Sequence, residues 1–190
     1  LGDLVVEKVC KQLSSWRDQG SLLKQVSINV SALQLSDDKL RLTMKHNLEK
    51  YQLPASLIAI ELTESSILED DGSAIEELQR LREMGIELQI DDFGTGYSSL
   101  SKLQSLDIDV IKIDQSFVYK LATDHQSKAL CETIVSIGSS LDIAIVAEGV
   151  ETSEQLQLLK AMGCDEIQGY LVSKPLPPEE IPALMTKKFF

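Results

Sequence analysis

Six short apolar segments recur along the chain, separated by stretches whose apolar residues follow helical spacing. The segments cover residues 26–31, 57–62, 86–90, 110–114, 143–148 and 165–168. The connections between them are too long for hairpins, so we expect parallel strands with helices packed between them. The nearly continuous apolar run at 57–62 is typical of a strand that is buried on both faces of a parallel sheet. The sequence therefore predicts an α/β fold.

A polar group stands at or near the end of each predicted strand. These groups are Asn29, Glu61, Asp91 with Asp92, Lys112 with Asp114, Glu148, and Gln168. In a (β/α)8 barrel the carboxyl ends of all strands open onto one face, so groups from different strands can form one site. An open sheet is the alternative, but six polar strand ends favour a TIM-like barrel, of which this sequence supplies six of the eight strands. We expect residues 1–190 to form a single domain, because this length can bury a sizeable core.

The stretch from Ile90 to Leu100 begins with two adjacent acidic residues and continues as a glycine-spaced loop. Asp91 and Asp92 have no adjacent Lys or Arg, and two neighbouring carboxylates are costly to hold together unless a cation shares them. The alternative is an ordinary turn that Asp opens at the end of a strand. Gly94 and Gly96 allow the loop to fold tightly or to lie close over a ligand.

Carboxylates together with one amide oxygen form a ligand set that suits Mg²⁺ or Mn²⁺, whereas zinc usually recruits His or Cys. Neither His46 nor His125 lies at a predicted strand end. Asp91 and Asp92 could be divided between two ions about 3.5–4 Å apart, the spacing that suits phosphoester hydrolysis. Glu148 could hold the second ion or orient a water molecule, although a single Glu after a strand is usually a loop residue.

Lys112 lies within a predicted strand, where its charge could steady an attacking water molecule or the transition state. A first alternative is a structural ion pair with Asp114 or with another neighbouring Asp. A second is a barrel aldolase in which Lys112 forms a Schiff base with a carbonyl substrate. The many carboxylates around the predicted site disfavour the aldolase.

The net charge and the cysteines argue against proteins that bind duplex nucleic acid and against disulfide-bonded or zinc-binding proteins. The formal net charge of −12 argues against binding to duplex nucleic acid, whose phosphates attract basic surfaces. Cys10, Cys131 and Cys164 are widely spaced and set among apolar neighbours, which indicates buried thiols in a reducing compartment rather than disulfides or a zinc site. We therefore expect a cytoplasmic location.

Six motifs follow one another in a fixed order. They are Asn29 within Ile-Asn-Val-Ser, Glu61-Leu62-Thr63-Glu64, Asp91 through Leu100, Lys112-Ile113-Asp114, Ala147-Glu148-Gly149-Val150-Glu151, and Gln168-Gly169-Tyr170. Each is weak alone, but together they resemble the motifs of bacterial EAL domains, the cyclic diguanylate phosphodiesterases. The resemblance covers essentially the whole chain. It implies a TIM-like barrel with an antiparallel first strand, two Mg²⁺ or Mn²⁺ ions, and hydrolysis of one phosphodiester of the cyclic dinucleotide to give the linear dinucleotide.

The resemblance also implies a role for each candidate residue. The two metals would be held by Asn29, Glu61, Asp91, Asp92 and Glu148, with Asp91 shared between them. Lys112 would support the water nucleophile, and Glu64 would brace the glycine loop. The substrate site would be lined by Asp114, Glu151 and Gln168.

The sequence departs from the family at one point. The Glu-Ala-Leu segment that gives the family its name, and the substrate-contacting Arg after it, would precede Leu1. On this resemblance the first strand and the Glu-Ala-Leu strand are missing. We expect an active parent domain but no appreciable phosphodiesterase activity from the sequence as it stands. The alternative is a binding module that senses cyclic diguanylate without cleaving it.

The resemblance finally implies interaction partners. A homodimer would be built partly on residues 94–106, where a ligand loop runs into an apolar helical stretch. The parent protein would carry sensor or other signalling domains, one of which could tether it to a membrane. The protein would bind cyclic diguanylate as its ligand, and it would not bind duplex nucleic acid.

Overall fold

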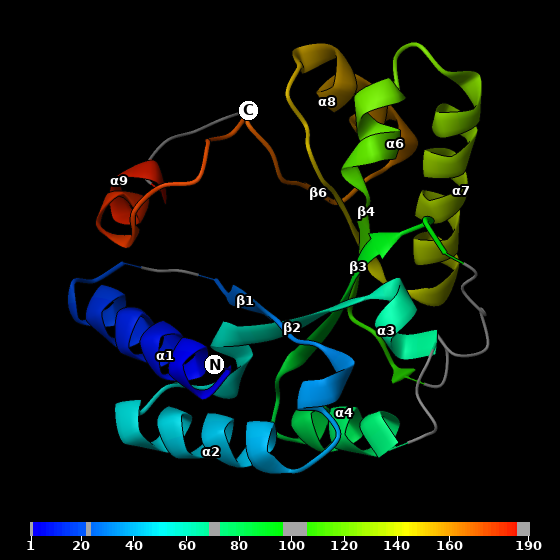
Figure 1. Ribbon diagram of the computed structural model, residues 1–190. Coiled ribbons are helices and arrows are strands. Elements are labelled where there is room, and N and C mark those ends of the chain that lie inside the picture. Colours follow the sequence, from blue (N-terminus) through cyan, green and yellow to red (C-terminus); the bar gives the residue numbers. More distant parts are fainter. Residues whose placement is uncertain (1, 22–23, 69–72, 97–105, 186–190) are drawn as a thin grey trace. The chain divides into compact units, whose positions relative to one another are not determined.

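The computed structural model describes residues 2–21, 24–68, 73–96 and 106–185 (Figure 1). The chain divides into two compact units. The first unit contains Leu1–Leu62, Glu69–Leu88 and Leu176–Phe190, and the second contains Thr63–Leu68 and Gln89–Pro175.

The first unit is built on two strands and the helices around them. Its elements are α1 (Gly2–Asp18), β1 (Val26–Asn29), η1 (Ala32–Gln34), α2 (Lys39–Tyr51), η2 (Ala55–Leu57), β2 (Ile58–Thr63), α4 (Ser73–Glu83), η3 (Pro178–Glu180) and α9 (Ile181–Met185). Strands β1 and β2 pair in parallel, with Val26 opposite Ile58 and Asn29 opposite Glu61. The first five residues of β2 are buried, which confirms the prediction of a strand covered on both faces.

Helix α1 packs against α2, and its apolar face supplies much of the core of the first unit. Val6, Cys10, Leu13 and Trp16 recur at near-helical spacing on that face, and all four are buried. The indole Nε1 of Trp16 donates a hydrogen bond of 3.0 Å to the carbonyl oxygen of Pro178, so the C-terminal segment is attached to this helix. The expectation that Trp16 belongs to the core is confirmed.

The second unit contains the central strands and the helices that connect them. Its elements are α3 (Glu64–Leu68), the later part of β3 (Glu87–Phe93), β4 (Val110–Ile113), α6 (Gln115–Lys120), α7 (His125–Leu141), β5 (Ala144–Ala147), α8 (Ser153–Met162) and β6 (Glu166–Ile167). Strands β4 and β5 pair in parallel, with Lys112 opposite Val146. Strand β6 continues the sheet beside β5, also in parallel.

The strand order in the sheet is β1-β2-β3-β4-β5-β6, which is the order of the sequence. Every strand pair whose register is described runs in parallel. Sequential parallel strands joined by helices form a right-handed α/β arrangement of the kind that closes into (β/α)8 barrels. The predicted fold class, six parallel strands of a TIM-like barrel, is therefore confirmed.

Two short helices were not expected from the sequence. Helices α3 and α6 each begin directly after a strand, at Glu64 and Gln115, and span only five and six residues. Such short segments show little helical periodicity, so the strand before them dominates the pattern. Helix α8 begins at a capping box of Thr152 and Gln155, a sequence signature of a helix N-terminus, and both hydrogen bonds of that box are present.

Residues 36–50 follow helical spacing after the polar stretch Ser36-Asp37-Asp38, but helix α2 begins only at Lys39. The hydroxyl of Ser36 donates to the carbonyl oxygen of Leu33, and the carboxylate of Asp37 accepts from the amide of Lys39. Both side chains therefore stabilise the turn that precedes the helix, a common use of Ser and Asp. A predicted short helix through Leu100 and Leu103 lies outside the described residues.

Within the described part of the chain, no helix combines the length and the apolar composition that a membrane-spanning segment needs. Cys10, Cys131 and Cys164 are all free thiols, the first two buried and the third half-buried. Burial raises the pKa of each thiol to about 11. The three cysteines are therefore protonated at neutral pH and weakly reactive.

Candidate functional site

Strand β3 carries a bulge at the two adjacent aspartates. Ile90 pairs with Ile111 and Phe93 pairs with Ile113, so Asp91 and Asp92 together face the single residue Lys112. In a regular strand, successive side chains point to opposite faces of the sheet. A bulge with two residues opposite one re-aims the side chains, and here it lets both carboxylates serve the same site.

The bulge is accompanied by an unusual backbone conformation. Asp92 has a φ of 55°, in the left-handed region that only Gly, Asn and Asp visit readily. Its backbone amide donates a hydrogen bond of 3.0 Å to Oδ1 of the neighbouring Asp91. Its carbonyl oxygen accepts a hydrogen bond of 2.8 Å from the hydroxyl of Thr95. These contacts hold the chain in the bulge at the point where the glycine loop begins.

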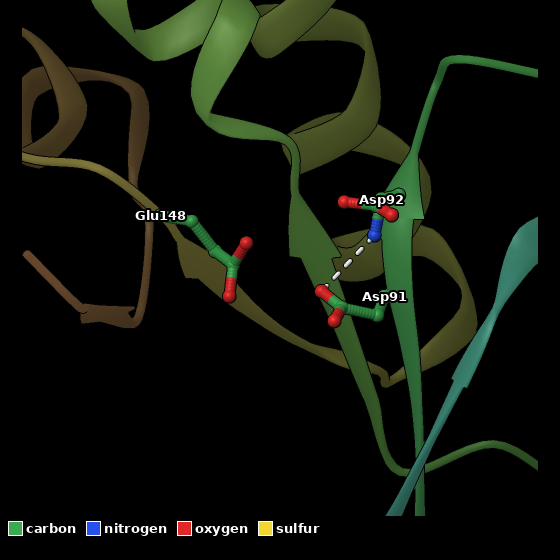
Figure 2. A group of neighbouring side chains, drawn as sticks. All are labelled: Asp91, Asp92 and Glu148. Carbon is green, nitrogen blue, oxygen red and sulfur yellow. Dashed lines mark hydrogen bonds between the residues drawn. The ribbon is translucent and has the colours of Figure 1, made fainter. Parts of the chain in front are cut away.

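Three carboxylates come together at this bulge. One oxygen from each of Asp91, Asp92 and Glu148 lies within 4.8 Å of the other two, and all three side chains are half-buried. Figure 2 shows that two of them come from the end of β3 and the third from the residue that follows β5. Among the described residues, this is the group of acidic, His or Cys side chains that is close enough to share a metal ion. We call these three residues the carboxylate cluster.

Lys112 lies against the carboxylate cluster and is nearly inaccessible to solvent, at 4% exposure. Its Nζ is 2.6 Å from Oε1 of Glu148 and 3.4 Å from Oδ1 of Asp91. The prediction that its side chain faces the site is consistent with these contacts. An ammonium held between two carboxylates stabilises them in the absence of any other cation.

The pKa of Asp92 is raised above its ordinary value. Burial is the main cause, and the negative charges of Asp91 and Asp114 add to it, while the charge of Lys112 acts in the opposite direction. The site therefore holds more negative charge than one lysine neutralises. Because its donors are carboxylate oxygens, it fits a hard divalent cation such as Mg²⁺, Mn²⁺ or Ca²⁺ better than zinc.

The substitution Asp92→Asn is expected to raise the unfolding temperature of the ion-free protein at pH 7. A raised pKa in the folded state means that ionisation of Asp92 costs stability once the pH exceeds the pKa of the unfolded chain. Asn removes this charge and tolerates the left-handed backbone. The gain should shrink near pH 3, where the carboxyl group is protonated in both states. Thermal unfolding at the two pH values measures it.

Asp142→Asn is the matched control, because Asp142 has a φ of 58° but is exposed at the end of α7. Asp142→Asn makes the same substitution at a left-handed backbone position, but Asp142 is not a member of the carboxylate cluster. An equal gain in both variants, independent of pH, would show that repulsion within the cluster does not destabilise the fold.

Glu64 contacts the glycine loop through two hydrogen bonds. Its side chain is buried, and its Oε2 accepts from the backbone amides of Gly94 at 2.9 Å and Gly96 at 3.2 Å. A Cβ at Gly96 would lie only 2.9 Å from Oε1 of Glu64, so a larger residue at this position would have to displace the end of that side chain. Among the described residues, Oε1 of Glu64 has no hydrogen-bond partner. The structure thus places Glu64 where the sequence predicted a brace for the loop.

Asp114 lies next to the site but has a structural contact of its own. It is the N-cap residue of α6, where its Oδ1 accepts from the amide and the hydroxyl of Ser116. It is also hydrogen-bonded to Asp92 and contributes to the raised pKa of that residue. The alternative predicted for Lys112 was an ion pair with Asp114 or with another neighbouring Asp, and the structure shows such a pair with Asp91, together with one to Glu148.

Glu151 and Gln168 are exposed and are held near the site through their backbones. The amide of Glu151 donates to the side chain of Gln155, and the carbonyl oxygen of Gln168 accepts from the amide of Val150. Neither side chain belongs to the carboxylate cluster. Their predicted role at the substrate remains a prediction.

Asn29 and Glu61 belong to the first unit, where they are partners at the carboxyl ends of β1 and β2. Glu61 is buried and Asn29 is exposed. The family resemblance implies that they hold a common metal ion, a role that the strand register does not test. Their assignment to the same site as Asp91 remains a prediction.

Residues 97–105, which make up most of the predicted dimer segment 94–106, lie outside the described residues. The sequence also gave no indication of the bulge, although two adjacent acidic residues before Phe93 and Gly94 are compatible with one.

A separate cavity of about 640 Å³ lies between α2 and α4 in the first unit. Apolar residues such as Leu48 and Met84 line it together with charged residues. Arg41 and Arg80 both pair with the buried Glu77, so their charges are compensated within the protein. None of the predicted site residues lines this cavity, and its balanced charges indicate no class of ligand.

Comparison with known proteins adds an independent finding. The family model described as EAL domain matches residues 1–175. The chain is 42% identical over 186 residues to the oxygen sensor protein DosP of Escherichia coli, covering 98% of this chain and 23% of that protein. It is 38% identical over 181 residues to the bifunctional diguanylate cyclase/cyclic di-GMP phosphodiesterase MucR of Pseudomonas aeruginosa, covering 95% and 26%. The chain thus spans about a quarter of the length of these curated relatives.

Solved structures show the same likeness. The phosphodiesterase PaMucR in complex with c-di-GMP has a TM-score of 0.90 at 38% identity, covering 95% of this chain and 73% of that one. Two structures of Klebsiella pneumoniae BlrP1 contain c-di-GMP with manganese or with calcium. The manganese complex has a TM-score of 0.80 at 31% identity and covers 91% of this chain and 44% of that one. The calcium complex has a TM-score of 0.74 at 33% identity and covers 80% of this chain and 39% of that one.

Proposed function

Because the chain belongs to the EAL domain family, we propose that it forms the catalytic site of a phosphodiesterase that hydrolyses cyclic di-GMP to the linear dinucleotide. The observation that carries the proposal is the carboxylate cluster with Lys112 held between Asp91 and Glu148. Relatives named as cyclic di-GMP phosphodiesterases, and structures of relatives with c-di-GMP bound, support the choice of substrate.

The residues of the second unit have separate roles in this proposal. Asp91, Asp92 and Glu148 would hold a divalent cation, which when bound supplies a more acidic water molecule and neutralises charge on the phosphoryl oxygens. Lys112 stabilises the negative charge that develops at the phosphate and holds the attacking water by a hydrogen bond. Glu64 fixes the amides of Gly94 and Gly96, so that the loop keeps its position beside the bulge.

We further propose that the metal is Mg²⁺ or Mn²⁺, that two ions take part, and that Asn29 and Glu61 join the ligand set. The manganese and calcium in structures of a relative support a divalent cation. Asp114, Glu151 and Gln168 would line the substrate site. The cytoplasmic location, a homodimer and additional signalling domains also belong to the proposal, and the greater length of the curated relatives supports the last of these.

The proposal is tested by measuring cyclic di-GMP binding by calorimetry and formation of the linear dinucleotide by chromatography. Each assay is run with Mn²⁺, with Mg²⁺, with Ca²⁺ and with excess chelator. We expect hydrolysis, with Mg²⁺ or Mn²⁺ only, from a parent domain extended upstream through a Glu-Ala-Leu strand, and no appreciable hydrolysis from these 190 residues alone. Ca²⁺ should inhibit, because it prefers longer and looser coordination that misplaces the reacting oxygens. Undiminished turnover in excess chelator would contradict a metal-dependent reaction.

Binding is measured as well as hydrolysis because we expect no appreciable hydrolysis from this sequence by itself. Binding of cyclic di-GMP therefore reports on the site even where turnover is absent. If the extended parent domain binds cyclic di-GMP tightly but turns it over with none of the metals, the second candidate, a sensor module for cyclic di-GMP, would be favoured. The aldolase alternative is disfavoured by the two ion pairs of Lys112, which require the ammonium form, whereas a Schiff base forms from the free amine.

A further inference from the structure

Two segments at the end of the sheet are joined through the backbone of one residue. Val150 donates a hydrogen bond of 3.0 Å to the carbonyl oxygen of Gln168 and accepts one of 2.9 Å from the amide of Leu171. Val150 lies two residues after Glu148, which belongs to the carboxylate cluster. The turn after β6 is therefore fastened to the loop that carries a member of the site.

The closeness of the two segments depends on Gly169. A Cβ at this position would lie 2.3 Å from both the amide nitrogen and the carbonyl oxygen of Val150. The turn is closed by hydrogen bonds from the amides of Val172 and Ser173 to the carbonyl oxygen of Gly169. Tyr170 lies between the two hydrogen bonds to Val150, so its backbone is held on both sides.

The side chain of Tyr170 is nevertheless largely free to meet a ligand, with 57% of its surface exposed. A large aromatic ring is usually buried for most of its area, so an exposed ring on a well-fixed turn is available for binding. The Nζ of Lys174 lies 5.5 Å from the centre of the ring. Aromatic surface and positive charge thus occur together at the edge of the second unit.

We propose that Tyr170 stacks against one base of the nucleotide substrate, and that Lys174 attracts the phosphate backbone beside it. The inference rests on the proposed function, because it assigns a base-binding contact to the same site. A planar base and an anionic phosphate match an aromatic face beside an ammonium. Tyr170 would then determine affinity and the preference for a base-bearing substrate, and it would take no part in bond cleavage.

The experiment compares Tyr170→Ala with Tyr170→Phe and Tyr170→Trp by calorimetry with cyclic di-GMP in the presence of Ca²⁺, which separates binding from turnover. Loss of a stacked base is expected to weaken binding on the order of 10-fold or more in Tyr170→Ala. Phe and Trp retain a flat aromatic face and should retain the affinity. Where turnover is measurable, KM should rise in Tyr170→Ala while kcat changes little.

Tyr119→Ala is the matched control, since Tyr119 is also exposed, at 73%, but lies on α6. It should bind cyclic di-GMP as tightly as the unsubstituted protein, and thermal unfolding of both alanine variants checks that they are folded. Unchanged affinity in Tyr170→Ala, or an equal loss in Tyr170→Phe, would overturn the stacking contact. Absence of any nucleotide binding by the unsubstituted protein would instead overturn the proposed function itself.

Discussion

Asp91→Asn is expected to lower the affinity for Mn²⁺ on the order of 100-fold or more, and hydrolysis should fall with it. Asp91 contacts Lys112 and is a member of the carboxylate cluster, so its charge serves both the ammonium and any bound cation. Asn keeps the size of the side chain but removes the charge. Calorimetric titration with Mn²⁺ measures the affinity and, in the same experiment, the number of ions bound.

The control for Asp91→Asn is Glu132→Gln, which removes the same charge from an exposed position on α7. Its affinity for Mn²⁺ should be unchanged. Glu64→Gln gives a second comparison, because Glu64 contacts the loop and not the cluster, and it should lose less affinity than Asp91→Asn. Equal losses in these two variants would mean that their roles have been assigned wrongly.

Gly169→Ala should lower the free energy of unfolding by about 3 kcal/mol or more, because a methyl group placed against a backbone cannot be accommodated without moving one of the two segments. The nearest atoms are the amide nitrogen and carbonyl oxygen of Val150, both 2.3 Å from the added Cβ. Movement of Val150 also displaces Glu148, so Mn²⁺ affinity should fall as well. Chemical denaturation and the metal titration measure the two effects.

Gly20→Ala separates backbone strain from steric overlap. Gly20 also has a positive φ, of 76°, but no atom lies within 4 Å of the position that its Cβ would occupy. This variant should lose only about 1 kcal/mol, the cost of a left-handed conformation for alanine. A similar loss in Gly169→Ala, with unchanged metal affinity, would contradict the role of Gly169 in positioning the Glu148 loop.

The strands could be predicted because their apolar residues form runs that no neighbouring pattern obscures. The run at 57–62 became β2, and its burial follows directly from its composition. Helices α3 and α6 could not be predicted in this way, because one turn and a half of helix contains too few residues to establish a period. Their starts depend on capping contacts such as that of Asp114, which side-chain spacing does not reveal.

The members of the site could be predicted from residue type and position, but their arrangement could not. The sequence shows that Asp91 and Asp92 are adjacent, and the ordinary alternation of a strand would separate their side chains. Only the register of β3 against β4 reveals that the pair faces Lys112 from one bulge. Likewise, the sequence suggested Asp114 or another neighbouring Asp as the partner of Lys112, and the distances show Asp91 together with Glu148, a partner that the sequence did not suggest.

The positive charge of Lys112 limits how many metal ions the second unit can attract. Three ionised carboxylates and one ammonium leave two negative charges, and Asp114 beside Asp92 brings the total to three, so a single divalent cation neutralises most of the charge. A second cation would make the cluster positive unless further anions accompany it. Each phosphate of the proposed substrate, a cyclic dinucleotide, is such an anion. On the proposed function, electroneutrality would link occupancy by a second ion to arrival of the substrate, so the resting site would discourage a full complement of metal until a phosphodiester is bound.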